Sequence, residues 1–108
     1  MTLEILTSEM LMPVNHGFFT RRGGASSGVF EGLNCGHGSS DQTEIVAINR
    51  ARAAQAMDVA PDQMATVHQI HSAKVVTVEE APQTRGIEAD AMVTATPGLC
   101  LSILTADC

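Results

Sequence analysis

The sequence predicts an α+β fold in which one helix packs against a sheet. Residues 44–57 show a helical spacing of apolar side chains, and the chain from Met64 onward is rich in the Val, Ile and Thr that suit strands. A glycine-rich stretch, typical of loops, precedes the helix. With 108 residues and no internal repeat, the chain has the size of one domain or of part of one. We therefore expect no internal domain boundary.

The segment before the helix is expected to be a loop. Phe18 and Phe19 suit a short strand, after which Gly and Ser dominate as far as Asp41. Six glycines between residues 23 and 38 give this backbone freedom to turn tightly or to approach a ligand. Neither the G-x-G-x-x-G nor the phosphate-loop pattern occurs here, so the glycines by themselves favour turns.

The helix is expected between Asp41 and Pro61. Asp41 followed by Glu44 resembles a capping box, and Pro61 ends the helical pattern. At about 100° per residue, the apolar side chains fall on one broad arc: Ile45, Val46, Ile48, Ala53, Ala56 and Met57. Asn49 lies inside this arc, where its amide must find hydrogen-bond partners. This position favours a buried amide that ties the helix to a loop over a contact with a ligand.

Four strand-like stretches follow the helix, at residues 64–71, 73–80, 90–95 and 99–106. A short link at Ser72 and Ala73 joins the first two. The last two are joined by Thr-Pro-Gly at 96–98, a sequence that suits a type II turn. Short links of this kind predict one or two antiparallel hairpins.

His68 and His71 raise the question of a metal site. If residues 66–71 form a strand, side chains three apart face opposite sides of the sheet, and these two cannot bind one ion. On a helix they would share a face, but the β-branched neighbours favour the strand. His71 is the better candidate for chemistry because it lies where the strand gives way to a link. A structural role, the commoner one for a lone histidine, suits His68.

Cys108 is the candidate partner of His71. A thiolate is a strong nucleophile and a soft metal ligand, so the pair suits either a zinc site or a hydrolase in which the thiolate attacks an acyl or amide carbon. A zinc site needs at least a third protein ligand. His16 and His37 are spare histidines, but no spacing favours either. The three cysteines lack CxxC spacing and are expected to be free thiols in a reducing compartment.

Charge and hydropathy limit the classes of partner. The net charge is −6, and the six Lys and Arg are scattered, which argues against nucleic acid as a partner. No apolar run approaches the roughly 18–20 residues that span a bilayer. The N-terminus carries acids where a secretory signal would carry cations. We therefore expect a cytoplasmic protein without a membrane partner.

Six motifs in order resemble those of the polyphenol oxidase laccase-domain family, also called YfiH-like: "HGFFTRRGGAS", "GLNCG", "INRAR", "HQIHSAKV", "ADAMVT" and "PGLCLSILTADC". The resemblance covers nearly the whole chain. It implies a layered α/β/β/α-type sandwich with a mostly antiparallel or mixed sheet. Residues 1–108 would form the first half of that single domain.

The resemblance also implies an activity, because family members include zinc-dependent purine nucleoside phosphorylases with adenosine deaminase activity. The expected partners are phosphate and a purine nucleoside, such as adenosine, inosine or guanosine. The expected products are the free base and ribose 1-phosphate. Zinc is the implied cofactor.

The family motifs assign roles to individual residues. His71 matches the metal-binding histidine of a Gln-x-His motif, and Cys108 matches the metal-binding cysteine of Thr-Ala-Asp-Cys, so both are implied as zinc ligands and catalytic residues. The third ligand is the histidine of a His-Ala-Gly-Trp-Arg-Gly motif expected beyond Cys108. Arg21, in a Thr-Arg-x-Gly-Gly element, is implied as a phosphate contact because a guanidinium binds phosphate bidentately. Asn34 and Asn49 match positions that organise the substrate pocket, and Asn34 is implied with Arg21 as a substrate- or phosphate-binding residue.

Three alternatives stay open. The older family name indicates a polyphenol oxidase with copper in place of zinc, although four histidines without a His-x-His pair argue against a multicopper site. The second alternative is the cysteine and histidine hydrolase. The third is an inactive truncated domain, because the third zinc ligand is absent from these 108 residues. The sequence does not predict an oligomeric state.

Overall fold

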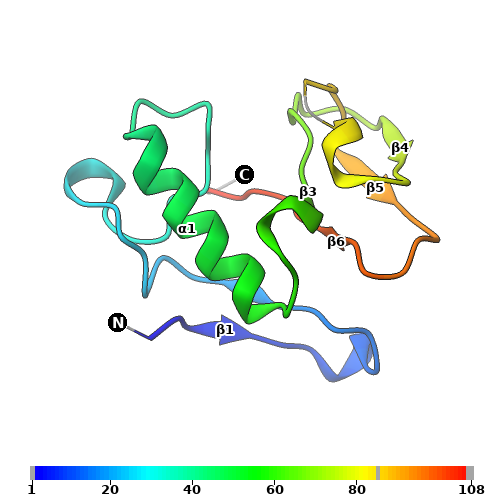
Figure 1. The fold of residues 1–108 in the computed structure, drawn as a ribbon, viewed down its shortest axis with the longest axis horizontal. Coiled ribbons are helices and arrows are strands. Elements are labelled where there is room, and N and C mark those ends of the chain that lie inside the picture. The colour runs from blue at the N-terminus through cyan, green and yellow to red at the C-terminus, as the bar shows by residue number, and fades with distance from the viewer. Residues whose placement is uncertain (1, 85, 107–108) are drawn as a thin grey trace. The chain divides into compact units, whose positions relative to one another are not determined.

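The protein has a mixed α/β fold with short strands and one α-helix in the residues that the computed structural model describes, 2–84 and 86–106 (Figure 1). The chain divides into two compact units, the first ending at Asp58 and the second beginning at Val59. One strand pair is antiparallel and two are parallel. The predicted α+β class with mixed strand pairing is confirmed. Within these residues, every helix falls short of the length and hydropathy that a bilayer-spanning helix requires.

The first unit opens with the antiparallel pair. β1 (Ile5–Leu6) pairs with β2 (Phe18–Phe19), and Ile5 lies opposite Phe19. A 3₁₀ turn at Glu9–Leu11 lies in the connection between them. The predicted strand at Phe18 and Phe19 is confirmed, whereas the residue pattern near the N-terminus does not reveal its partner.

His16 closes the connection between β1 and β2. Its Nε2 accepts a hydrogen bond from the backbone N–H of Ser8 at 2.8 Å, and its Nδ1 lies 2.7 Å from the carbonyl oxygen of Val14. A ring nitrogen that accepts an N–H carries no proton, so this geometry suits the neutral tautomer protonated at Nδ1. Both ring nitrogens of His16 therefore contact backbone groups of this connection.

The helix α1 (Thr43–Ala56) lies within one residue of its predicted bounds. Its C-cap residue is Met57, and Asp58 then adopts a left-handed conformation with φ of 60°. The buried positions form a narrower stripe than predicted: Val46, Asn49, Ala53 and Ala54. Ile48 and Ala56 are exposed, so their assignment to the buried arc was wrong. Two of the four buried side chains are the small alanines Ala53 and Ala54, so the buried face is narrow.

The predicted capping box at the start of α1 is wrong. The N-cap residue is Gln42, and no side chain caps the first turn. Asp41 does accept the N–H of Gln42, but its other oxygen is bound by the side chains of Ser26 and Asn34. The carboxylate therefore serves the preceding loop, which offers it two donors from outside the helix.

The second unit contains two parallel strand pairs. β3 (Met64–Ala65) pairs with β6 (Cys100–Leu101), and β4 (Val75–Thr77) pairs with β5 (Ala91–Val93), beside it in Figure 1. A small core lies around the buried side chains of Ala65, Val78 and Ala81, with Val76, Met92, Leu99 and Leu101 packed against them.

The predicted antiparallel hairpins are therefore wrong. Residues 78–90, which include a 3₁₀ helix at Ala81–Thr84, separate β4 from β5. This is a connection of the dozen or so residues that two parallel neighbours require. The link at 96–98 leads from β5 to β6, which pairs with β3 instead of with β5. Strand propensity is the same for both pairings, so composition alone did not distinguish them.

Candidate functional site

A buried amide organises the glycine-rich loop of the first unit. Asn49 of α1 is completely buried, and its Oδ1 accepts the backbone N–H of Ala25 at 2.7 Å. Its Nδ2 donates to the hydroxyl of Ser26 and to the carbonyl of Asn34, both at 2.8 Å. Both the oxygen and the nitrogen of the buried amide therefore have hydrogen-bond partners. The prediction that Asn49 ties the helix to a loop is confirmed.

Asp41 extends this arrangement. Its Oδ2 accepts hydrogen bonds from the Ser26 hydroxyl at 2.5 Å and from Asn34 Nδ2 at 3.1 Å. The bond from Ser26 is the largest cause that holds the pKa of Asp41 below its ordinary value. We call Ser26, Asn34, Ser39, Asp41 and Asn49 the loop–helix network.

Asn34, predicted to contact the substrate, lies at the centre of the loop–helix network. Its Nδ2 donates to Ser39 Oγ at 3.0 Å as well as to Asp41, and its Oδ1 accepts the backbone N–H of Gly36 at 3.2 Å. The side chain therefore braces the loop from both ends of its amide. A role of Asn34 in binding substrate stays a prediction.

Two arginines of α1 hold carbonyl groups of the same loop. Arg50 Nε donates to the carbonyl of Cys35, and Arg52 Nη1 donates to the carbonyl of Gly23, both at 2.7 Å. Burial lowers the pKa of Arg50 and raises that of the nearby Cys35 thiol. A guanidinium stays charged under these conditions, so both bonds are charge-assisted. The helix thus fixes the loop at separate points along its length.

Close backbone contacts explain two of the loop glycines. A Cβ atom on Gly24 would overlap the carbonyl group of Gly32. Gly32 has φ of +114°, and a Cβ there would overlap the carbonyl oxygen of Arg21. The N–H of Leu33 also donates to that carbonyl at 2.8 Å. At these positions the glycines serve the folding of the loop on itself, as the turn interpretation predicted.

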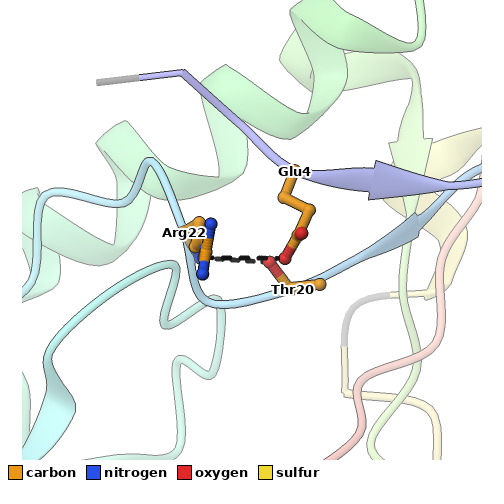
Figure 2. Close-up of polar contacts among 3 residues, drawn as sticks. All are labelled: Glu4, Thr20 and Arg22. Carbon is orange, nitrogen blue, oxygen red and sulfur yellow. Dashed lines mark hydrogen bonds and ion pairs between the residues drawn. The ribbon is translucent and has the colours of Figure 1, made fainter.

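Arg21, the predicted phosphate contact, is exposed, and its guanidinium has no hydrogen-bond or ion-pair partner among the described residues. Its neighbour Arg22, in contrast, lies near an acidic side chain. Figure 2 shows Arg22 beside Glu4 and Thr20, with Nε 3.8 Å from Glu4 Oε1 and the backbone N–H donating to Thr20 Oγ1 at 3.3 Å. Of these two adjacent cations, Arg22 already lies near a carboxylate, whereas Arg21 has no such partner among the described residues.

In the second unit, the segment that carries His71 leaves the parallel ladder as a loop. The backbone of His68 forms an isolated parallel β-bridge with that of Glu88, and strand pairing resumes where Val75 lies opposite Ala91. Val75 follows His68 by seven positions, whereas Ala91 follows Glu88 by three. The segment between His68 and Val75 is therefore four residues longer than its partner and forms a loop. The predicted continuous strand over residues 64–71 is therefore wrong beyond Ala65, where β3 ends. Strand alternation consequently does not assign a side to His71.

The carboxylate of Asp90, the residue before β5, holds this loop. Oδ1 accepts the backbone N–H of Ile70 at 3.1 Å and both the N–H and the hydroxyl of Ser72 at 2.9 and 2.7 Å. Oδ2 accepts the N–H of His71 at 2.9 Å. The Ser72 hydroxyl is the largest cause that lowers the pKa of Asp90 to about 2. Asp90 is therefore ionised at neutral pH.

His71 lies at the centre of the loop that Asp90 holds. Its φ of 58° is left-handed, a conformation that costs a non-glycine residue roughly 1–2 kcal/mol. Charge-assisted hydrogen bonds to the carboxylate offset this cost. The exposed His71 is thus presented on a backbone that is fixed at three consecutive peptide groups.

Gln69 ties the same loop to the segment after β6. Its Nε2 donates to the carbonyl of Leu104 at 2.9 Å, and its Oε1 accepts the N–H of Leu104 at 2.8 Å. The side-chain amide thus pairs with a peptide group as a neighbouring strand would. Gln69 precedes His71 by two residues and Leu104 precedes Cys108 by four, so this pair links the two motifs that carry the predicted zinc ligands.

The described cysteines are not activated thiols. Burial raises the pKa of Cys35 and of Cys100, so both carry their proton at neutral pH. Both are free of disulfide bonds. The predicted catalytic and metal-binding Cys108 lies outside the described residues.

The predicted site residues occur in both units. Arg21 and Asn34 belong to the first and His71 to the second. Among residues 2–84 and 86–106, no three His, Cys, Asp or Glu side chains form a group that could hold a metal. The donor types fit zinc, because imidazole nitrogen and thiolate sulfur are among its usual ligands. The fixed backbone at His71 also suits a ligand that must keep one orientation.

Sequence reasoning missed Asp90, Gln69 and the two arginines of α1. All four lie inside the motifs "ADAMVT", "HQIHSAKV" and "INRAR", which was the available signal. Their roles depend on backbone groups far along the chain, which no local spacing specifies.

The fold is that of YfiH-type domains. A Neisseria meningitidis protein of known structure, NMB0706, matches with a TM-score of 0.78 and 34% identity over 96% of this chain and 42% of its own. The Bacillus licheniformis hypothetical protein YfiH matches with a TM-score of 0.77 and 29% identity over 85% of this chain and 38% of its own.

Residues 15–108 match the family described as multi-copper polyphenol oxidoreductase laccase, and the chain belongs to this family. The resemblance inferred from the six motifs is thereby confirmed.

Two relatives are named purine nucleoside phosphorylase. The Deinococcus radiodurans protein is 47% identical over 98 residues, which are 90% of this chain and 37% of that protein. The Corynebacterium glutamicum protein is 41% identical over 98 residues, which are 89% of this chain and 40% of that protein. The chain thus spans about two fifths of the length of these relatives.

Proposed function

We propose that the protein carrying this chain is a zinc-dependent purine nucleoside phosphorylase that also deaminates adenosine. The observation that carries the phosphorylase assignment is the 47% identity to a Deinococcus radiodurans relative of that name. In the proposed reaction, phosphate attacks C1′ of the nucleoside, the C–N glycosidic bond breaks, and the base leaves with a proton. The products are ribose 1-phosphate and the free purine.

His71 and Cys108 are the proposed zinc ligands, with a third histidine from a part of the protein beyond them. The placement of His71 supports this role, because its backbone is held by Asp90 while the residue stays exposed. The chemistry that zinc supplies at such a site is Lewis-acid activation of an oxygen nucleophile. That chemistry suits the attack of water on the adenine ring in deamination.

Arg21 is the proposed phosphate contact. Its guanidinium is exposed and has no partner among the described residues, so it can bind two phosphate oxygens without first breaking an ion pair. Asn34 supports the proposed phosphate site indirectly, because its side chain holds the loop at Gly36 and Ser39.

The assignment is tested with the protein expressed from its complete gene. Incubation with inosine and phosphate is expected to release hypoxanthine, and His71→Ala is expected to abolish the release. The absence of free base from wild-type protein with zinc present would refute the phosphorylase assignment. Adenosine supplied without phosphate tests deamination separately, through the appearance of inosine.

Chelation separates this proposal from a cysteine hydrolase that uses Cys108 as the nucleophile and His71 as the base. Removal of zinc is expected to stop base release, and added Zn²⁺ is expected to restore it. A metal-free enzyme that retained full activity would instead favour the thiolate mechanism.

The family description supports one alternative, a copper polyphenol oxidase. The chain contains four histidines and no His-x-His pair, which is a poor supply of ligands for several copper ions. Copper-loaded protein is therefore expected not to oxidise phenols. Phenol oxidation that required copper, with no phosphorolysis, would reverse the assignment.

A further inference from the structure

We propose that Asp90 is a positioning residue that orients His71 for metal binding. The inference rests on the proposed function, because it takes His71 to be a zinc ligand. Asp90 itself contacts no reacting group in this proposal. Its role is to set the backbone from which the imidazole projects.

The first support is the concentration of hydrogen bonds on one carboxylate. Three consecutive backbone N–H groups, of Ile70, His71 and Ser72, together with the Ser72 hydroxyl, donate to Asp90. Both carboxylate oxygens are used, and His71 is the middle residue of the three. The peptide group at His71 therefore cannot rotate without breaking a charge-assisted bond.

The second support is the way Asp90 is held. Its own N–H and that of Ala91 donate to the carbonyl of Lys74, where the parallel pairing resumes. On the other side of the loop, the N–H of Ala89 donates to the carbonyl of His68. The loop is thus bonded to the paired strands at both ends, and the carboxylate accepts the N–H groups of three residues between those ends.

The third support is the backbone conformation. Successive N–H groups around a left-handed residue form a concave nest that elsewhere binds anions such as phosphate. Here the protein's own carboxylate occupies the nest. This excludes the nest as a phosphate subsite and leaves orientation of the His71 side chain as the function of the turn.

The test uses Co²⁺, whose visible absorption reports ligand geometry, bound to the protein expressed from its complete gene. Asp90→Asn keeps the size of the side chain but removes the charge and replaces one acceptor with an NH₂ group that faces the loop N–H groups. Co²⁺ affinity is expected to fall about tenfold or more, as for other residues that orient metal ligands. The d–d absorption bands are also expected to shift.

Asp62→Asn is the matched control, because Asp62 is an exposed aspartate of the same unit and the charge change is identical. It is expected to leave Co²⁺ affinity and spectrum as in the wild type. Ser72→Ala removes one of the four bonds to Asp90 and is expected to weaken Co²⁺ binding less than Asp90→Asn does.

The outcomes separate the two levels of inference. If His71→Ala binds Co²⁺ as the wild type does, the proposed zinc site is wrong. If His71→Ala abolishes binding while folded Asp90→Asn keeps wild-type affinity and spectrum, only the positioning role is overturned. If Asp90→Asn does not fold, Ser72→Ala decides: a shifted Co²⁺ spectrum supports the role, and an unchanged one overturns it.

Discussion

The side-chain amide of Asn49 donates to the hydroxyl of Ser26 across 2.8 Å, and both residues are buried. The hydroxyl in turn donates to Asp41, so one chain of hydrogen bonds runs from the helix to the loop before it. A buried amide in an apolar stripe is therefore one of the groups that connect α1 to the glycine-rich segment, together with the guanidinium groups of Arg50 and Arg52. Leu33, the residue before Asn34, donates its N–H to the carbonyl of Arg21, so this connection lies next to the backbone of Arg21.

Replacing Asn49 by leucine is expected to lower the free energy of unfolding by about 2–4 kcal/mol. Leucine has a similar volume, but it leaves the N–H of Ala25 and the carbonyl of Asn34 without their partner. Urea unfolding measures the loss. Gln55→Leu, on the exposed side of the same helix, is the matched control and should change stability by less than about 0.5 kcal/mol. Equal losses in both variants would contradict the structural role of Asn49.

The contribution of Asp41 to stability is expected to depend on pH. The pKa of Asp41 is lowered in the fold, chiefly by the bond from Ser26, so its stabilising effect is complete above the unfolded value of about 3.9. The effect is lost as the pH falls below that value and through the lower folded pKa. The difference in stability between wild type and Asp41→Asn should therefore be largest near neutral pH and shrink below about pH 4. A difference that stayed constant down to pH 2.5 in thermal unfolding would argue against this pairing.

Arg21 and Arg22 are expected to differ in their effect on phosphate. If Arg21 binds phosphate, Arg21→Ala should raise the KM for phosphate about tenfold or more, because a hydrogen-bonded charge pair is lost. Arg22→Ala is a control of the same charge at the next position, where the guanidinium lies near Glu4 on the surface. It should leave the KM for phosphate nearly unchanged. Steady-state kinetics at saturating inosine distinguishes the two, and similar effects would indicate a general loss of positive charge instead of a contact.

The pairing of Gln69 with Leu104 is expected to protect one amide from exchange. Gln69→Ala removes the acceptor of the Leu104 N–H and should speed its hydrogen exchange by about two- to tenfold. Gln69→Glu keeps an acceptor oxygen but loses the donor to the Leu104 carbonyl, so protection of the N–H should be largely retained. Exchange measured by NMR tests both variants. Unchanged exchange in Gln69→Ala would show that the pair does not persist in solution.

Local features of the fold were predictable, because they depend on neighbouring residues. The helix occupies Thr43–Ala56 where residues 44–57 were predicted, and Asn49 has the partners that its place in the apolar stripe required. The family and its phosphorylase relatives were also indicated by the order of the motifs.

Strand pairing was not predictable in the same way. The stretches after Met64 have strand composition, but β4 and β5 pair in parallel across a crossover, and β6 pairs with β3. Side-chain propensity describes how well a residue fits a pleated surface, and it carries no information about the direction of the neighbouring strand. The expected hairpins failed for this reason.

For the candidate site, the sequence by itself determined the chemical types: an imidazole at His71, a thiol at Cys108 and a guanidinium at Arg21. The tertiary structure decided how His71 is presented. A carboxylate 19 positions away accepts its N–H and fixes it in a left-handed turn, outside the strand that its neighbours predict. A hydrogen bond over that separation depends on the path of the whole unit, and residue type and local spacing do not specify that path.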